Sequence, residues 1–148
     1  WMFNDKAVLQ RHLTSGAQKS AWTGDIVPIK LINWSMFPFH IECKNGYKDH
    51  IPTFMNFTII EKWLKKELDE RQSNQPIVWL IARFHNQRKM IFITDTMFDP
   101  KVIHHVITIE FDYEGTYTTF YMYYFEDLLK LNFDTVFKHN EMLKKVLT

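Results

Sequence analysis

Cysteine is almost absent from this chain: Cys43 is the one cysteine among 148 residues. A single thiol excludes an intrachain disulfide framework and a zinc site built on paired cysteines. The sequence also lacks any run of about 18 apolar residues, the length that a membrane-spanning helix requires, and it has no segment with the pattern of a signal peptide. We therefore expect a cytoplasmic protein with no membrane partner.

Glycine is scarce as well, with four residues, and neither charge is in excess, because 18 Lys and Arg offset 17 Asp and Glu to a net charge of +1. So balanced a chain does not indicate a nucleic-acid binder by bulk charge, and any basic surface has to be local. Hydrophobic residues make up 46% and charged residues 24% of the chain, which indicates a globular protein. The length of 148 residues predicts a single domain, 1–148.

Apolar periodicity predicts helices and strands in alternation. The clearest helix is 58–72, where apolar residues recur at helical spacing and Thr58 and Glu61 form a capping box. The run 77–84 is apolar almost throughout, as in a strand buried on both faces. The other predicted elements are a helix within 1–13, strands 25–33, 37–45 and 90–95, a hairpin of 102–111 and 117–125, and helices 126–131 and 134–147. This order predicts an α/β fold with a central mixed β-sheet flanked by helices.

Three ionisable residues, Asp25, Glu42 and Lys44, fall on the neighbouring strands 25–33 and 37–45. Residues i and i+2 of a strand point to the same face, so Glu42 and Lys44 share a face and Cys43 points the other way, into apolar surroundings. If the two strands pair as a hairpin, Asp25 lies level with Lys44 or just beyond it. We therefore expect the three charges to converge on one part of the sheet.

Two converging carboxylates favour a divalent cation, because side by side they repel each other and one pKa rises. Hard oxygen ligands with concentrated negative charge suit Mg²⁺, which also keeps several waters and takes a substrate phosphate. The predicted ligands are the Asp25 and Glu42 carboxylates and the Cys43 backbone carbonyl. We expect Lys44 to hold the attacking water and to stabilise the anion that develops at phosphorus.

The bare pattern of an acid, any residue and a lysine is weak, since Asp99, Pro100 and Lys101 form a second copy by chance. The first copy differs by its context, with Gly24 before Asp25, strand-like flanks and a long helix downstream. The competing interpretation is a structural Glu42–Lys44 pair on a solvated strand face, where such pairs contribute little to stability.

These residues carry a resemblance to a known family. The segments GDIV, 24–27, and FPFHIECKN, 37–45, resemble the PD-(D/E)xK nuclease superfamily, and among its members the Holliday-junction-resolvase-like endonucleases of phages. The preceding segment RHLTSGAQKSAWTGD, 11–25, resembles the Ser/Gly-rich loop that those proteins place before the metal-binding Asp. The resemblance covers residues 11–95 and implies a restriction-endonuclease-like fold, and we expect residues 96–148 to extend the sheet and helices of the same domain.

The resemblance also implies an activity: a Mg²⁺-dependent endodeoxyribonuclease, with Mn²⁺ as a substitute, in which Asp25, Glu42 and Lys44 form the catalytic set. The implied substrate is branched or duplex DNA. A four-way junction is approximately two-fold symmetric and paired nicks need two active sites, so we expect a homodimer, in the host cytoplasm if the protein is viral. The alternative is a non-catalytic nuclease-fold subunit, DNA-binding or structural, in a larger viral or replication assembly.

Two features frequent in such enzymes are weakly matched here. An additional acid on a first helix has only Asp5 as a poor counterpart. A Gln or Lys on the helix after the acid-x-Lys strand has several alternatives, namely Lys62, Lys65, Lys66 and Gln72.

Polar residues on either side of the catalytic set are candidates for phosphate contacts, the alternative being ordinary solvated loops. The candidates are Arg11, Ser15, Lys19 and Arg83. The adjacent His104 and His105 would face opposite sides of a strand, and with His40 we interpret them as structural. We expect the aromatic run 117–125 to pack in the core or a dimer interface, the alternative being that it stacks on unpaired bases. The Lys and Glu residues of 61–71 should form the solvated face of their helix.

Overall fold

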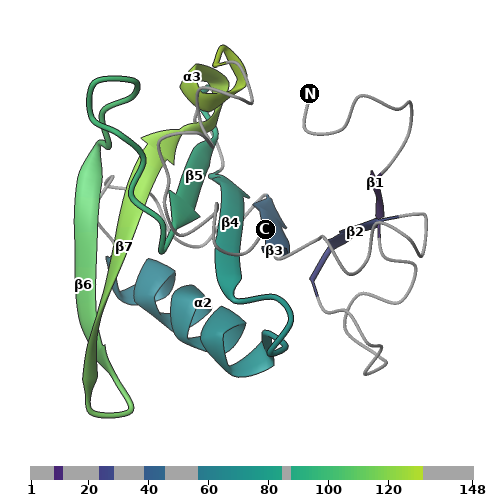
Figure 1. The fold of residues 1–148 in the computed structure, drawn as a ribbon, viewed down its shortest axis with the longest axis vertical. Coiled ribbons are helices and arrows are strands. Elements are labelled where there is room, and N and C mark those ends of the chain that lie inside the picture. The colour runs from purple at the N-terminus through teal and green to yellow at the C-terminus, as the bar shows by residue number, and fades with distance from the viewer. Residues whose placement is uncertain (1–8, 12–23, 29–38, 46–56, 85–87, 132–148) are drawn as a thin grey trace.

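The computed structural model describes residues 9–11, 24–28, 39–45, 57–84 and 88–131, and all structural statements concern these residues. Within them lie a five-stranded sheet in the order β3-β4-β5-β7-β6 and a two-stranded sheet of β1 and β2 (Figure 1). The strands are β1 Leu9–Arg11, β2 Ile26–Pro28, β3 Phe39–Asn45, β4 Ile77–Arg83, β5 Ile91–Thr94, β6 Ile107–Tyr113 and β7 Thr116–Tyr124, and the helices are α2 Phe57–Glu70 and α3 Phe125–Leu129.

The larger sheet is mixed, which confirms the predicted α/β architecture. Strand β3 runs parallel to β4, with α2 as the connection between them, and the pairs β4–β5, β5–β7 and β6–β7 are antiparallel. A parallel pair requires a crossover connection, and a helix is the usual one. Neither described helix is long and apolar enough to cross a membrane.

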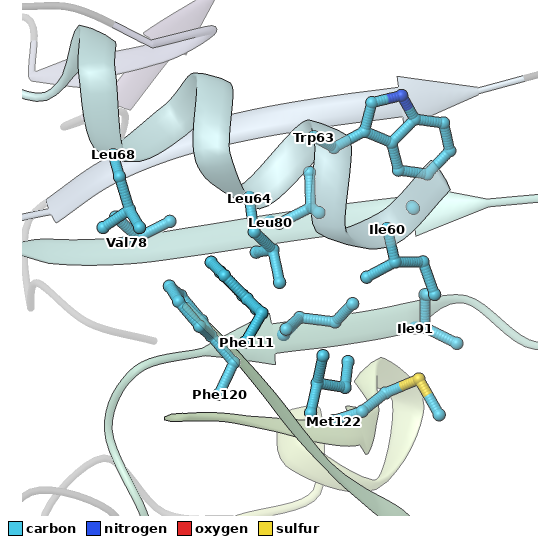
Figure 2. Close-up of a cluster of buried hydrophobic side chains, with 13 residues drawn as sticks. Ile60, Trp63, Leu64, Leu68, Val78, Leu80, Ile91, Phe111, Phe120 and Met122 are labelled. Atoms are coloured by element: carbon cyan, nitrogen blue, oxygen red, sulfur yellow. The ribbon is translucent and has the colours of Figure 1, made fainter. Parts of the chain in front are cut away.

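Helix α2 covers one face of the sheet (Figure 1). Its buried positions Leu64 and Leu68 point toward Leu80 and Val78 of β4, and Ile60 points toward Ile91 of β5 (Figure 2). The same cluster continues onto the three strands beyond β4, through Ile91, Ile93, Ile109, Phe111, Phe120 and Met122. The apolar residues that recur at helical spacing within 58–72 therefore form the stripe that packs on the sheet.

The opposite face of the sheet carries a second, aromatic cluster. Phe39 and Trp79 lie with ring centroids 4.1 Å apart, and Phe98 packs against Tyr123 at 5.1 Å. The hydroxyl of Tyr123 accepts a hydrogen bond from the Phe98 backbone N–H at 3.0 Å. Because successive residues of β4 enter the two clusters alternately, this strand is buried on both faces, as its apolar run predicted.

For the described parts of the two segments, 25–28 and 39–45, the predicted pairing of strands 25–33 and 37–45 as a hairpin is wrong. Strand β2 pairs with β1, antiparallel, whereas β3 takes β4 as its partner. The apolar β4 is buried on both faces and needs a hydrogen-bonded partner strand on each edge. Strand β3 is the partner on one edge. The hairpin model relied on sequence proximity alone.

The other predicted helices and strands agree with the structure in some places and differ in others. The helix predicted within 1–13 is wrong where it can be compared, because Leu9–Arg11 is a strand. The adjacent histidines His104 and His105 precede β6 instead of lying within it. Helix 58–72 and strand 90–95 are confirmed with small shifts of boundary, and α3 falls where 126–131 was predicted. The hairpin of β6 and β7 is confirmed as well, but its first strand begins at Ile107 and not at residue 102. The predicted helix 134–147 lies outside the described residues.

A glycine brings the segment before β2 against β3. Gly24 has φ +104°, and a Cβ atom at this position would lie 2.7 Å from the Ile41 carbonyl oxygen. Real Cβ atoms do not approach a backbone oxygen so closely, and a positive φ disfavours any other residue. Gly24 therefore permits the backbone of the next residue, Asp25, to donate a hydrogen bond to that same carbonyl at 2.6 Å.

Replacing Gly24 by alanine should detach this segment from β3. Gly115, in the turn between β6 and β7, provides the matched control, since it also has positive φ (+77°) but nothing lies within 4 Å of an added Cβ. A strained φ costs about 1–3 kcal/mol at either position, so only the Gly24→Ala variant adds a steric clash. Native-state hydrogen exchange should show the Cys43 amide losing protection in Gly24→Ala but keeping it in Gly115→Ala. Equal protection in both variants would contradict this explanation of Gly24.

A second feature, Asp95 at the end of β5, makes the stability of the fold depend on pH. Burial raises the pKa of this carboxyl from 3.8 to about 6, although the Val78 backbone N–H and the Arg71 guanidinium act in the opposite direction. The Arg71 nitrogen lies 3.6 Å from the carboxylate. Because the folded pKa exceeds the unfolded value, stability from this group is complete below about pH 4 and is lost as the pH rises through about 6.

The Asp95→Asn variant should not lose stability in this way as the pH rises. The two pKa values differ by about 2, which corresponds to about 3 kcal/mol at most, so the variant should be up to that much more stable than the parent at pH 7–8. Near pH 4 the two proteins should be equally stable, because both side chains are then neutral. Urea unfolding across this pH range measures the difference, and parallel profiles for the two proteins would show that Asp95 is not the group responsible.

Candidate active site

The proposed site lies along the edge of β3 that faces away from β4, here called the outer edge of β3. There the Asp25 backbone N–H bonds to the Ile41 carbonyl, and the Asp25 carboxylate accepts a hydrogen bond from the Cys43 backbone N–H at 2.9 Å. The backbone groups of one residue in a strand point to the same side. The Cys43 carbonyl therefore faces the outer edge of β3 beside the Asp25 carboxylate.

Glu42 and Lys44 occupy the face of β3 that is turned toward α2. They alternate with Ile41 and Cys43, so their side chains share a face, as predicted. The Lys44 ammonium forms an ion pair with the Glu42 carboxylate, and both side chains are largely buried. The Glu42–Lys44 pair is thus not a solvated surface pair, which removes the main premise of the structural interpretation.

Cys43 itself does not lie in apolar surroundings, and this expectation is wrong. The thiol is exposed. The face of β3 that it shares with Phe39 and Ile41 is buried at the start of the strand and becomes exposed toward its end. The aromatic cluster covers only the first half of β3, so the second half emerges into solvent where the charged residues are.

A fourth residue, Glu67 of α2, joins this group and was missed in the sequence. Its side chain is fully buried, and its Oε2 lies 2.8 Å from Nε2 of the equally buried His40. Its Oε1 lies 3.6 Å from the Lys44 Nζ. The expectation that the Glu residues of 61–71 are solvated is therefore wrong for Glu67, although Glu61 and Glu70 do form partly exposed pairs with Lys65 and Lys66.

The sequence did contain a signal for Glu67. Position 67 follows Ile60 by seven residues, Trp63 by four and Leu64 by three, so it falls within the apolar stripe that packs on the sheet. A charge at such a position requires a partner in the core. His40 gave the complementary signal, since it shares the face of β3 with Glu42 and Lys44 by simple alternation.

The electrostatics of Glu42 reflect this crowding. Burial raises its pKa above the ordinary value, and the negative charges of Glu67 and Asp25 raise it further, whereas the bond and charge of Lys44 lower it. The described part of the site thus gathers the Glu42 and Glu67 carboxylates around one lysine ammonium, with the Asp25 carboxylate near enough to raise the pKa of Glu42. Such an excess of negative charge is relieved when a cation binds.

The donors of this site fit a hard divalent cation. No group of three or more His, Cys, Asp and Glu side chains in the described part of the chain forms a metal cage. Mg²⁺ does not require one, because it is usually held by one or two carboxylates, with waters and substrate phosphates completing the octahedron. The Asp25 and Glu42 carboxylates and the Cys43 carbonyl are donors of that kind.

The structure describes two of the four residues that were predicted to bind phosphate. Arg11 of β1 pairs with Ile26, the residue after Asp25, so its backbone lies beside the site. Arg83 is exposed at the end of β4 and pairs with Asn45, the last residue of β3. Ser15 and Lys19 lie outside the described residues. Arg88 and Lys89 follow Arg83 as exposed side chains, and the Lys89 ammonium lies 4.0 Å from the centre of the Tyr124 ring.

The chain is similar to a known protein family over most of its length. The model of the "Phage putative PDDEXK endonuclease" family matches residues 5–143. It thus extends through residues 96–143, which lie beyond the resemblance seen in the sequence. No curated protein and no solved structure matches the chain. With a sheet and helices of the restriction-endonuclease-like kind and a family match over nearly its full length, the chain belongs to this phage PDDEXK endonuclease family.

Proposed function

We propose that this member of an endonuclease family is a Mg²⁺-dependent enzyme that hydrolyses phosphodiester bonds of DNA. One observation carries the proposal: the Asp25 carboxylate is bonded to the Cys43 N–H at 2.9 Å, next to the buried Glu42–Lys44 pair. A mere structural pair would not need the third charge, nor the glycine that allows it to approach.

Asp25 and Glu42 are the proposed metal ligands, together with the Cys43 carbonyl. The Cys43 N–H orients the Asp25 carboxylate, so that one oxygen is held at the outer edge of β3. Glu42 must be ionised to act as a ligand, and the charge of Lys44 supports that state against the burial that opposes it. When bound, Mg²⁺ would supply an acidified water and positive charge for the reacting phosphate.

Lys44 is the proposed third catalytic residue. Its ammonium is held within the site by two carboxylates, Glu42 and Glu67. From this position it can donate a hydrogen bond to the attacking water or to a phosphate oxygen as negative charge develops there. Its partial burial strengthens such a contact, because the effective dielectric is lower than in water.

Phosphate contacts beyond the reacting group are assigned to Arg11, Ser15, Lys19 and Arg83. The backbone of Arg11 lies next to Asp25 on one side, and Arg83 lies one strand in from the end of β3 on the other. A strand of DNA crossing the outer edge of β3 would pass between these two positions. Such contacts add affinity without sequence specificity.

For the substrate we propose branched DNA, in particular a four-way junction, cut by a homodimer. The likeness of residues 24–27 and 37–45 to junction-resolving phage enzymes supports this choice, as does the two-fold symmetry of the junction itself. Labelled junction and linear duplex, each incubated with the protein, separate the alternatives: symmetric paired nicks in the junction support it, and equal cutting of linear duplex refutes it.

The catalytic assignment predicts that Asp25→Asn and Glu42→Gln abolish cleavage while the fold survives. Each substitution removes a charge and keeps the shape, so loss of the proposed cation contacts should lower the rate by more than about 100-fold (about 2.7 kcal/mol). Asp99→Asn, in the second acid-x-Lys sequence of the chain, is the matched control and should cut normally.

The measurement is a cleavage time course in Mg²⁺, repeated with the metal chelated, alongside thermal unfolding of each variant. The parent protein should lose its activity on chelation and regain it when Mg²⁺ is restored. Full cleavage by either variant, or by the parent in chelator, would refute the assignment. Intact folding without cleavage of any DNA by the parent would favour the non-catalytic subunit.

A further inference from the structure

Glu67 is a buried carboxylate that the proposed ligand set does not use. It is fully buried in the apolar stripe of α2, where an ionised group is costly unless it is paired. Its Oε2 contacts His40, whereas its Oε1 has no hydrogen bond and faces Lys44 at 3.6 Å. One oxygen is therefore anchored, and the other is available to the lysine.

Lys44 lies between two carboxylates with different tasks. Its ammonium is bonded to Glu42, one of the proposed ligands. While that bond persists, the lysine and a cation compete for the same carboxylate. Glu67 lies within reach as a second partner for the ammonium, so Lys44 can leave Glu42 without being left unpaired in a largely buried site.

We propose that Glu67 is a positioning residue that retains the Lys44 ammonium when Glu42 ligates the divalent cation, and that His40 fixes the Glu67 carboxylate for this role. The inference rests on the proposed function. It explains why a charged residue stands in the apolar stripe of α2, and why a histidine stands two residues before Glu42 on the same face of β3.

A direct role for Glu67 as a metal ligand is less well supported. Its Oε2 is committed to His40, and its other oxygen is directed at the lysine. A direct ligand would act with or without Lys44, whereas a positioning residue acts only through it, and this difference can be measured.

The experiment is a double-mutant cycle on Mn²⁺ affinity, measured by calorimetry without DNA. The parent, Glu67→Gln, Lys44→Met and the double variant form the cycle. Glu67→Gln should weaken Mn²⁺ binding about tenfold (about 1.4 kcal/mol), because Lys44 then stays on Glu42. In the Lys44→Met background the same change should alter the affinity by less than about threefold, since the competing ammonium is gone.

Glu70→Gln is the matched control, since Glu70 lies one turn along the same helix in a half-exposed pair with Lys66, and it should bind Mn²⁺ as the parent does. In cleavage assays Glu67→Gln should lower kcat by about tenfold or more and change KM by less than about twofold, because Lys44 acts on the transition state. Thermal unfolding tests whether Glu67→Gln folds. If it does not, His40→Asn replaces it in the cycle and should weaken Mn²⁺ binding only when Lys44 is present.

Equal weakening in both backgrounds, or no weakening in either, would overturn the positioning role. If the parent binds Mn²⁺ and cuts DNA but the cycle shows no coupling, only this inference fails. If the parent neither binds Mn²⁺ nor cuts DNA, the proposed function fails and the positioning role fails with it.

Discussion

Two hydrogen bonds between Asp25 and the outer edge of β3 hold the whole candidate site together. One joins the Asp25 N–H to the Ile41 carbonyl, and the other joins the Cys43 N–H to the Asp25 carboxylate. Both depend on Gly24, because any side chain there would collide with the Ile41 backbone. Without this contact Asp25 would only precede the small sheet of β1 and β2, and the acid-x-Lys strand would carry two of the three proposed ligands, Glu42 and the Cys43 carbonyl.

The position of β3 in the sheet makes this contact possible. Its partner β4 is buried on both faces and lies between β3 and β5, so β3 is the last strand of the larger sheet in the described part of the chain. An edge strand leaves alternate N–H and C=O groups unpaired. Here those of Ile41 and Cys43 receive Asp25, while Glu42 and Lys44 turn toward α2 and meet Glu67. The edge and the adjoining face of one strand thus bring together groups from three separate segments of sequence.

The apolar pattern of the sequence was enough to predict those helices and strands that are buried through their own apolar residues. Helix 58–72, the buried strand 77–84 and the hairpin of β6 and β7 all follow from local periodicity. Local periodicity could not predict the pairing partner of β3. That partner depends on where the chain joins the sheet again after the crossover helix α2, which is a property of the whole fold. The sequence-based prediction placed Asp25 near Glu42 by assuming a hairpin, and that assumption was wrong. In the structure Asp25 comes near Glu42 because it bonds to the backbone of Ile41 and Cys43 at the outer edge of β3. Glu67 was missed because helical charges were assigned to solvent by residue type, although its spacing placed it in the buried stripe.

We expect the outer edge of β3 and the adjoining Glu42 carboxylate to form one cation site. A crystal structure with Mn²⁺, with anomalous differences recorded near the manganese absorption edge, tests it most directly. We expect a peak bonded to the carboxylates of Asp25 and Glu42 and to the Cys43 carbonyl oxygen, with Lys44 displaced toward Glu67. A saturating Mn²⁺ soak that leaves the Glu42–Lys44 ion pair intact, with no peak beside Asp25, would contradict it.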